Sequence, residues 1–289
     1  WFVYLLTGLG MGLPLLLVRK GTFFLGKPEV ASPFTPLVIG SLALFSMTAV
    51  YLTTARPVPA PDRTQLKIMT YNIQQGVDVE GNKSLEALLA VIRAEDPDIL
   101  GLQESDTARV ANGNVDAVLY FADNLDMYSY YGPTTTTGTF GIALLSKYPI
   151  QNPATFFMHS TGEQTATIQA EINNGDTAYQ IFVTHLGNDG PIFQLEDMLT
   201  RIQSLDSGQP VIAMGDFNFR PTTEQYGLMT QTLADAWLLK WPGGKETPGI
   251  SSEKRIDHIF VSPGLTVLES EYGRSPASDH PYEYIVIEP

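Results

Sequence analysis

The sequence of 289 residues contains no cysteine, which excludes disulfide bonds and thiolate metal sites without indicating a cellular compartment. Basic residues are also scarce, since 17 Lys and Arg stand against 31 Asp and Glu. Residues 1–56 contribute four basic residues and one acidic residue, so residues 57–289 carry 13 basic and 30 acidic residues. Proteins that hold nucleic acid by its phosphates usually spread Lys and Arg over one face, so a nucleic-acid partner is less expected. The acidity fits equally a role in solubility alone.

Charged residues are absent from two stretches near the start of the chain, residues 1–18 and 36–55. A helix needs roughly 20 apolar residues to cross a bilayer core of about 30 Å; the second stretch has that length and the first nearly does. We therefore expect residues 1–56 to form two transmembrane helices, with the lipid bilayer as a partner. The chain starts without Met or a basic leader, so we expect this hairpin to be the tail of a longer membrane region, with other membrane-protein subunits as candidate partners.

Basic residues flank the second uncharged stretch on both sides, so charge orients the hairpin poorly. We favour a cytoplasmic hairpin loop and an integral membrane protein whose C-terminal domain is extracytoplasmic. Prolines 57, 59 and 61 indicate a semi-rigid linker. The expected organisation is a membrane hairpin at residues 1–56, a linker at 57–65 and a domain at 66–289.

The sequence of the domain predicts more strands than helices. Hydrophobic periodicity predicts helices over residues 85–94 and 191–205. Short apolar runs predict strands at residues 66–71, 98–102, 141–145, 165–172, 179–184, 211–214, 256–261, 265–268 and 284–287. Strands outnumber helices and alternate with them irregularly, which favours two mixed β-sheets packed face to face with helices outside. The expected fold is a four-layer α/β sandwich preceded by two transmembrane helices.

Polar side chains with catalytic potential follow or begin several of these strands. Gly215-Asp216-Phe217-Asn218 ends the apolar run at residues 210–214, and Arg255-Ile256-Asp257-His258 opens another strand. Ser278-Asp279-His280 places an acid beside an imidazole near the C-terminus, and Glu104 lies just beyond the strand at 98–102. Each motif alone has an ordinary explanation as a strand end or a solvated loop. Together they indicate a metal-assisted phosphoesterase.

Cleaving a phosphodiester with water requires a nucleophile made from water, neutralisation of charge on the phosphoryl oxygens, and help for the leaving oxygen. Mg²⁺ can supply the last two and needs only one or two carboxylates, because it usually keeps several waters. We expect Mg²⁺ as the cofactor, with Mn²⁺ as an alternative. A small or membrane-borne phosphodiester bound through such a cation suits the acidic chain better than a nucleic acid does.

The order of the motifs resembles the endonuclease/exonuclease/phosphatase superfamily, which includes deoxyribonuclease-I-like nucleases, neutral sphingomyelinases and inositol-polyphosphate phosphatases. The resemblance covers roughly residues 66–288. The motifs that carry it are Met69-Thr70-Tyr71-Asn72, Leu102-Gln103-Glu104, Thr184-His185-Leu186, Gly215-Asp216-Phe217-Asn218, Arg255-Ile256-Asp257-His258 and Ser278-Asp279-His280. For the metal, the resemblance implies that Glu104 binds Mg²⁺, with Asn72 and Asp279 close to the ion or its waters.

For the reaction itself, the resemblance implies that His280 is the general base and that Asp257 orients it. It also implies that Asp216 positions the attacking water, while Asn218 and His185 stabilise the charged transition state. These residue types suit those roles, because an imidazole held by a carboxylate takes a proton near neutral pH. Amide and imidazole donors stabilise charge as it develops on phosphoryl oxygens.

Further stretches resemble the C-terminal domain of GPI-anchor lipid-remodelling membrane proteins. They are Leu102 to Asp106, Gly113 to Asp116, Met127 to Pro133, Thr139 to Ile150 and Val183 to Asn188. That group is linked to exchanging diacylglycerol for ceramide on GPI anchors, and its terminal domain is lumenal. The resemblance implies a membrane-anchored, metal-dependent phosphodiesterase acting on a lipid-linked phosphodiester: GPI-like, sphingolipid or phospholipid. A membrane-tethered nuclease and a non-catalytic subunit of a larger membrane complex are the alternatives.

Overall fold

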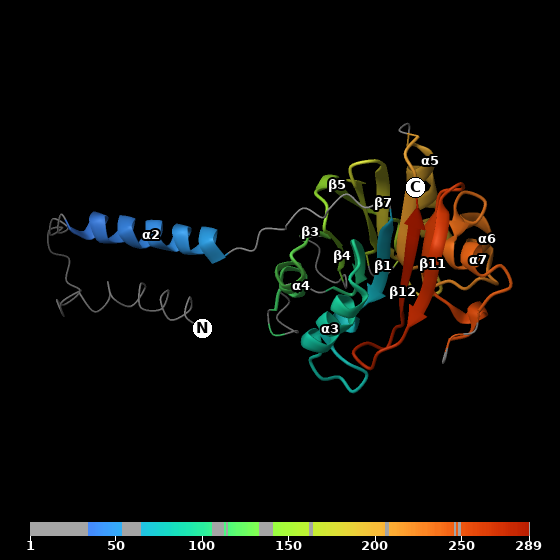
Figure 1. Ribbon diagram of the computed structural model, residues 1–289, viewed down its shortest axis with the longest axis horizontal. Coiled ribbons are helices and arrows are strands. Elements are labelled where there is room, and N and C mark those ends of the chain that lie inside the picture. Colours follow the sequence, from blue (N-terminus) through green and yellow to red (C-terminus); the bar gives the residue numbers. More distant parts are fainter. Residues whose placement is uncertain are drawn as a thin grey trace. The chain divides into compact units, whose positions relative to one another are not determined.

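A computed structural model describes the greater part of the chain (Figure 1). The described residues are 34–53, 65–105, 113, 115–132, 141–161, 164–205, 208–245, 247 and 250–288. By its contacts the chain divides into two units, Trp1–Ala55 and Arg56–Pro289. The expected linker at 57–65 lies outside the described residues except for Gln65.

In the first unit, helix α2 (Phe34–Thr53) coincides closely with the expected second membrane span. Most of the apolar side chains described along it are exposed, among them Leu44 and Met47. Within the described ranges, no helix combines the length and the apolar character needed to cross a membrane. The prediction of two transmembrane helices is therefore not supported, and the first of them, residues 1–18, lies outside the described residues.

The second unit contains two six-stranded mixed sheets. The first has the strand order β11-β12-β1-β2-β4-β3, and the second has the order β5-β6-β7-β8-β10-β9. Two pairs are parallel, β1 with β2 and β7 with β8, and all other pairs are antiparallel. The strands of the first sheet are β1 (Leu66–Asn72), β2 (Ile99–Gln103), β3 (Tyr128–Gly132), β4 (Ile142–Ser146), β11 (Thr266–Gly273) and β12 (Tyr282–Glu288). Those of the second are β5 (Ile150–Phe157), β6 (Ala166–Asn173), β7 (Ala178–His185), β8 (Val211–Asp216), β9 (Ala234–Asp235) and β10 (Asp257–Val261).

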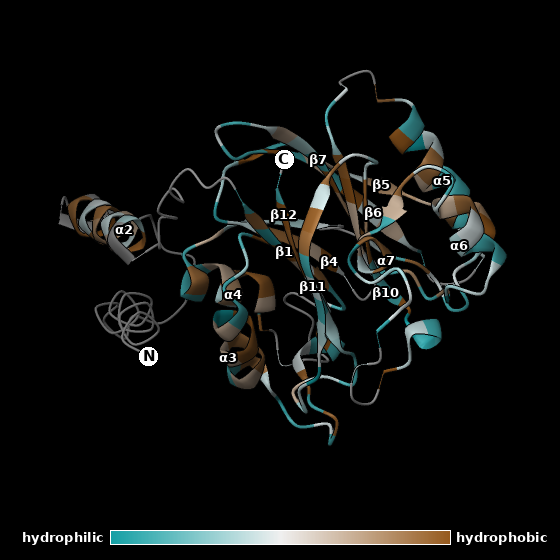
Figure 2. Cartoon of the chain, turned by 45° about the vertical axis from the view of Figure 1, so that its right-hand side comes forward, coloured by the Kyte–Doolittle hydropathy of each residue, from teal (hydrophilic) through white to brown (hydrophobic). Residues whose placement is uncertain are grey.

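Helices cover the outer face of each sheet. Helices α3 (Leu85–Glu95) and α4 (Ala117–Leu125) pack on the first sheet, and α5 (Ile192–Gln203) and α6 (Glu224–Met229) pack on the second, on opposite sides of the domain (Figure 2). Each helix buries one apolar stripe, because apolar residues recur every three or four positions. The shorter elements are α7 (Ala236–Lys240) and the 3₁₀ turns η1 (Gln74–Gly76) and η3 (Ser252–Lys254).

Three buried clusters hold these layers together: one between the sheets, and one between each sheet and its helices. Strands β1, β2 and β8 are almost wholly buried, because they lie between the opposing sheet and a helix layer. This explains the nearly continuous apolar runs of β2 and β8, which are typical of strands covered on both faces; in β1 Lys67 and Thr70 interrupt the run. The expected four-layer α/β sandwich is confirmed for the domain.

Candidate active site

The topology brings the predicted site residues to one edge of the two sheets. Asn72 and Asp216 end β1 and β8, His185 ends β7, and Glu104 follows β2. Since β1 and β2 are parallel, and β7 and β8 are parallel, these side chains emerge at the carboxyl ends of neighbouring strands. The antiparallel strand β10 begins at Asp257 directly opposite Asp216.

Strand direction also explains the position of His280, which lies two residues before β12. That strand runs antiparallel to β1, and its first residue, Tyr282, pairs with Tyr71. His280, just before the start of β12, therefore lies at the same sheet edge as Asn72, at the end of β1. Ser278 fixes this approach, because its Oγ donates to the Asn72 carbonyl at 2.7 Å and accepts from the His280 amide at 3.2 Å.

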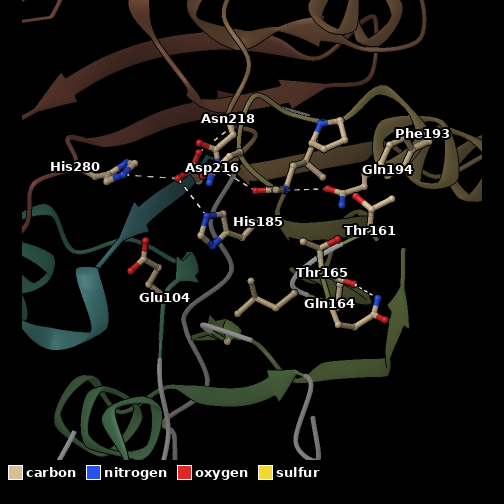
Figure 3. Close-up of a pocket in the computed structure, with 17 residues that line it drawn as sticks. Glu104, Thr161, Gln164, Thr165, His185, Phe193, Gln194, Asp216, Asn218 and His280 are labelled. Carbon is tan, nitrogen blue, oxygen red and sulfur yellow. Dashed lines mark hydrogen bonds and ion pairs between the residues drawn. The ribbon is translucent and has the colours of Figure 1, made fainter. Parts of the chain in front are cut away.

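A cavity of about 440 Å³ opens at this edge (Figure 3). Five of the eight predicted site residues line it: Glu104, His185, Asp216, Asn218 and His280. The other three lie around it. Asn72 and Asp257 are buried behind the lining residues, and Asp279 is exposed, with its backbone amide donating to Gln74 Oε1 at 3.2 Å.

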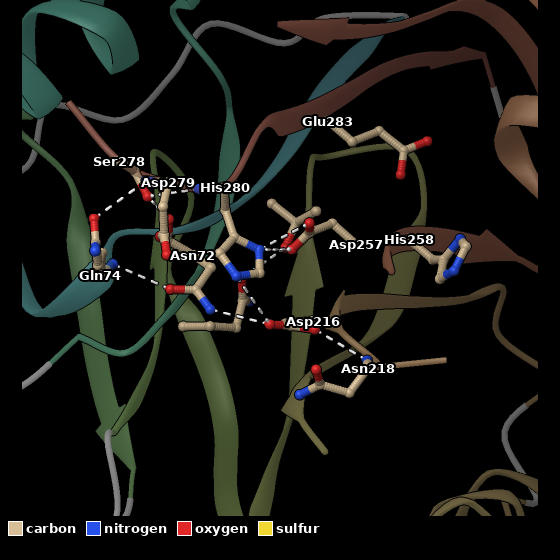
Figure 4. Close-up of polar contacts among 12 residues, drawn as sticks. Asn72, Gln74, Asp216, Asn218, Asp257, His258, Ser278, Asp279, His280 and Glu283 are labelled. Carbon is tan, nitrogen blue, oxygen red and sulfur yellow. Dashed lines mark hydrogen bonds and ion pairs between the residues drawn. The ribbon is translucent and has the colours of Figure 1, made fainter. Parts of the chain in front are cut away.

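The buried Asn72 amide links two carboxylates, and Figure 4 shows its contacts with Asp216 and Gln74. Its Nδ2 donates to Glu104 Oε1 at 3.2 Å and to Asp216 Oδ2 at 3.0 Å. Its Oδ1 accepts from the backbone amide of Gln74 at 3.1 Å, which fixes the orientation of the side chain. Asn72 therefore directs hydrogen-bond donors, and not its oxygen, toward the carboxylates. In this arrangement it positions a carboxylate ligand and does not itself present an oxygen to a cation.

Asp257 and His280 form a close pair. Nδ1 of His280 lies 3.0 and 3.2 Å from the two Asp257 carboxylate oxygens, and Asp257 is 1% exposed. Burial raises the pKa of Asp257 to about 6, although the neighbouring His280 opposes the rise. Burial works to lower the pKa of His280, but the carboxylates of Asp257, Asp216 and Asp279 outweigh it and raise that pKa to about 10. The imidazole is therefore held protonated at neutral pH by the surrounding carboxylates.

The carboxylate of Asp216 lies at the centre of the cluster. Nε2 of His185 is 3.5 Å from its Oδ2 and Nε2 of His280 is 3.7 Å away, while the Asn218 amide donates to Oδ1 at 3.0 Å. The side chain of Asn218 donates to the Leu186 carbonyl at 2.8 Å, which ties the loop after β8 to the end of β7. Asp216 is thus surrounded by donors that fix its position.

The backbone near the site adopts unusual conformations. Glu104 and Asn218 have positive φ values of 49° and 54°, in the left-handed region that few residues other than glycine occupy. Gly215 has φ of 151°, and a Cβ there would collide with the carbonyl of Thr184 on the neighbouring strand. Backbone conformations of this kind cluster at functional sites, where surrounding contacts hold them.

A group of three residues and the single carboxylate of Glu104 could each hold a divalent cation. Within the described residues, Asp216, Asp257 and His280 offer ligand atoms within 4.8 Å of one another. A cation there would compete with the pairing of His280 Nδ1 with Asp257. Glu104 lines the cavity and accepts only from the carboxamides of Asn72 and Gln75, at 3.2 and 3.4 Å, among the contacts described. Its hard oxygens suit Mg²⁺, so the residues present fit the expected cofactor.

Some residues of the site carry no sequence signal. Gln75 contacts Glu104 Oε2, and Thr161, Gln164 and Phe193 line the far end of the cavity. The described residues 159–161, 164 and 165 lie between β5 and β6, and polar residues of that kind are common in ordinary loops. No motif or periodicity distinguishes them, so only the fold shows that they face the site.

A buried ion pair supports β10 from behind. Arg255 Nη2 lies 2.7 Å from Asp235 Oδ2, and both side chains are 1% exposed. The hydroxyl of Tyr226 donates to the same carboxylate at 2.7 Å. Arg255 in the Arg255-Ile256-Asp257-His258 motif therefore anchors the strand that presents Asp257, and does not reach the cavity.

Comparison with known proteins agrees with this geometry. The curated protein cwh43 of Schizosaccharomyces pombe is 32% identical over 154 residues, which cover 50% of this chain and 15% of that protein. The structure resembles an endonuclease/exonuclease/phosphatase from Beutenbergia cavernae (TM-score 0.60, 22% identity, 78% of this chain and 72% of that one). It also resembles the human Nocturnin catalytic domain with bound sulfate (TM-score 0.59, 22% identity, 78% and 94%). These structural likenesses show the fold.

The sequence profile of the Endonuclease/Exonuclease/phosphatase family matches residues 69–280, which contain both sheets' central strands and all eight predicted site residues. The resemblance seen in the motifs is thereby confirmed. This chain belongs to the endonuclease/exonuclease/phosphatase family.

Proposed function

We propose that this chain is a divalent-cation-dependent phosphodiesterase that hydrolyses a lipid-linked phosphodiester at a membrane surface. The observation that carries the proposal is the convergence of Glu104, Asp216, His185 and His280 on one cavity, with Asp257 behind His280. A carboxylate for a cation, a carboxylate beside an imidazole, and a second imidazole are what water attack on phosphorus needs.

In this proposal Glu104 holds Mg²⁺ or Mn²⁺, and Asn72 positions Glu104 through its amide. The bound cation supplies charge neutralisation at the phosphoryl oxygens and at the leaving oxygen. The exposed Asp279 lies near enough to raise the pKa of His280 and is available to the cation or its waters.

The protein's own residues orient and transfer protons. Asp216 and the Nε2 atom of His280 both face the cavity. The Asp216 carboxylate orients an attacking water, and the neutral imidazole of His280 accepts a proton from that water. Asp257 holds the other nitrogen and so selects which ring nitrogen faces the substrate. The carboxylates raise the pKa of His280 to about 10, and a bound cation that offset part of their charge would favour the neutral imidazole, which is the form that accepts a proton. As an imidazolium, together with His185 and the Asn218 amide, it stabilises phosphoryl charge.

Charge and similarity support a lipid-linked substrate over a nucleic acid. The described residues that line the cavity include no Lys or Arg, so they offer no path for a phosphate backbone. The likeness to cwh43 agrees with the motif resemblance to GPI-anchor lipid-remodelling proteins. The exposed apolar side chains of α2 support a bilayer partner. On the same resemblance we propose that the domain acts on the extracytoplasmic side.

Release of head groups from lipid vesicles tests the proposal. The full chain is assayed on phosphatidylcholine, sphingomyelin and phosphatidylinositol vesicles with Mg²⁺, with Mn²⁺ and with EDTA. We expect cation-dependent release that falls by about 10²-fold or more in Glu104→Gln and His280→Ala. The surface variant Gln151→Ala, on the exposed part of β5, is the matched control and retains full activity.

Two outcomes identify the alternatives. Ready cutting of plasmid DNA without head-group release favours the membrane-tethered nuclease. Absence of turnover on any phosphodiester, together with no binding of Mg²⁺ or Mn²⁺, favours a non-catalytic subunit of a membrane complex.

A further inference from the structure

The cavity has a second set of side chains beyond the reaction centre. We call this set the head-group end; it consists of Thr161, Gln164, Thr165, Phe193 and Gln194. Figure 3 shows these side chains together at one end of the cavity, with Glu104 and His280 at the other. They come from the described residues of the β5–β6 connection and from the first turn of α5, and none of the eight predicted site residues lies in these segments.

Hydrogen bonds within the protein hold the head-group end in a fixed shape. Gln194 is 3% exposed; its Oε1 accepts from the Gly187 amide at 2.8 Å and its Nε2 donates to Ser160 Oγ at 3.3 Å. The hydroxyl of Ser160 also lies 3.0 Å from Thr165 Oγ1. The two chain segments that form this end are therefore joined through Ser160 before any ligand arrives, which lowers the entropic cost of binding.

Gln164 lines the cavity and carries one acceptor beyond its hydrogen bonds within the protein. Its Nε2 donates to the Met158 carbonyl at 2.8 Å and to the Thr165 carbonyl at 3.1 Å, so both amide hydrogens are used. Two carbonyl partners also fix which end of the amide is nitrogen. The Oε1 atom remains as an acceptor, and the exposed Thr161 lines the same cavity with its hydroxyl group.

Phe193 adds a half-buried aromatic face to this polar wall. Its ring packs edge-on against His159 with centroids 5.2 Å apart, which restrains the ring. Fixed polar groups beside an aromatic side chain are the usual composition of a small-ligand site. Here the ring offers an apolar surface to the C–H face of a ligand while Gln164 and the threonines meet its polar edge.

The chemistry of these groups selects among head groups. An additional phosphate is disfavoured, because the five residues of the head-group end supply acceptors and hydroxyls but no Lys, Arg or His side chain. A quaternary ammonium is usually held by several aromatic faces, and Phe193 is the sole aromatic residue in the described lining. Hydroxyl groups fit best, since each can donate to Gln164 Oε1 and exchange hydrogen bonds with the threonine hydroxyls.

We infer that the head-group end binds an uncharged, hydroxyl-rich group, a polyol or sugar carried on the scissile phosphodiester. This inference rests on the proposed function for its place in the reaction, but binding can be tested without turnover. A site built to bond hydroxyls rejects ligands that lack them, because its polar groups are then left unpaired.

Ligand-observed NMR on the full chain measures binding without hydrolysis, because EDTA removes the divalent cations. The probes are myo-inositol and choline chloride, and the variants are Gln164→Ala and Phe193→Leu. Gln203→Ala, on α5 but outside the cavity, is the control. We expect myo-inositol to bind in preference to choline, and each of the two cavity variants to weaken it about tenfold. Equal or tighter binding of choline, or unchanged binding in Gln164→Ala, would overturn the inference.

Turnover separates this inference from the proposed function. With Mg²⁺, hydrolysis of bis(p-nitrophenyl) phosphate reports the chemistry without any head group. Phosphatidylinositol, phosphatidylinositol 4-phosphate and phosphatidylcholine then report preference. We expect kcat/KM to be highest for phosphatidylinositol by about tenfold, with the preference lost through KM in Gln164→Ala. Hydrolysis of the simple diester with no such preference contradicts the inference alone; no hydrolysis while myo-inositol still binds contradicts the proposed function alone.

Discussion

The buried imidazole of His258 makes a specific prediction about acid stability. The ring is fully buried next to Asp257 and stacks on Phe219 with centroids 5.6 Å apart. Its Nε2 lies 3.1 Å from the Phe219 carbonyl, so this nitrogen carries the hydrogen. The other nitrogen, Nδ1, is buried and has no hydrogen-bond partner among the described residues. A proton added there would be a buried charge with no acceptor.

The sign and size of the effect follow from this environment. Burial, followed by the positive charge of Arg255, lowers the pKa of His258 from 6.5 to about 4. As pH falls below 6.5, His258 becomes protonated in the unfolded chain but stays neutral in the folded chain. Stability is therefore lost between pH 6.5 and about 4. Because the unfolded chain binds this proton and the folded chain does not, the free energy of unfolding falls by about 3 kcal/mol at pH 4.

Urea unfolding at pH 7 and pH 4 measures this loss, with His258→Gln as the comparison. Glutamine keeps a donor for the Phe219 carbonyl but cannot be protonated in this range. We expect the free energy of unfolding of the unmodified chain to fall by about 3 kcal/mol more than that of the variant. Carboxylates that titrate in both proteins cancel in the difference. Parallel loss in the two proteins would refute the reasoning that His258 is held neutral.

Three further predictions concern the groups behind the site. Arg255→Ala leaves Asp235 as an unpaired buried charge, so we expect urea unfolding to show a loss of about 3–5 kcal/mol; a loss below 1 kcal/mol contradicts this. Tyr272 donates to the Asp257 backbone carbonyl, so Tyr272→Phe should lower kcat and shift its pH profile with KM unchanged. Asn72→Ala should weaken Mn²⁺ binding about 10–100-fold by calorimetry, and an unchanged affinity argues against its positioning role.

The sequence predicts the central strands well and the peripheral ones poorly. Strands β1, β2 and β8 are buried on both faces and are therefore mainly apolar, and their ends lie within two residues of the prediction. Strand β5 was missed because its side chains are mostly exposed, and because it contains Pro153 and a register shift against β6. An exposed edge strand places no demand for apolar residues on the sequence.

The site shows the same division. Because the central strands end at one edge, the convergence of the polar residues that follow them could be predicted, and five of the eight predicted site residues line one cavity. The orientation of the Asn72 amide could not be predicted, since it depends on Gln74 and on carboxylates distant in sequence. The individual catalytic roles stay predictions. The membrane spans rested on composition alone, and the described part of the chain does not support them.

The central claim is that the cation binds at Glu104 and leaves the pair of Asp257 and His280 intact for proton transfer. Mn²⁺ binding to the full chain, followed by electron paramagnetic resonance, tests it in two variants. We expect Glu104→Gln to weaken Mn²⁺ binding at least tenfold, while Asp257→Asn leaves it within about twofold. Loss of Mn²⁺ binding in Asp257→Asn with full binding in Glu104→Gln would place the ion among Asp216, Asp257 and His280, and would contradict the account.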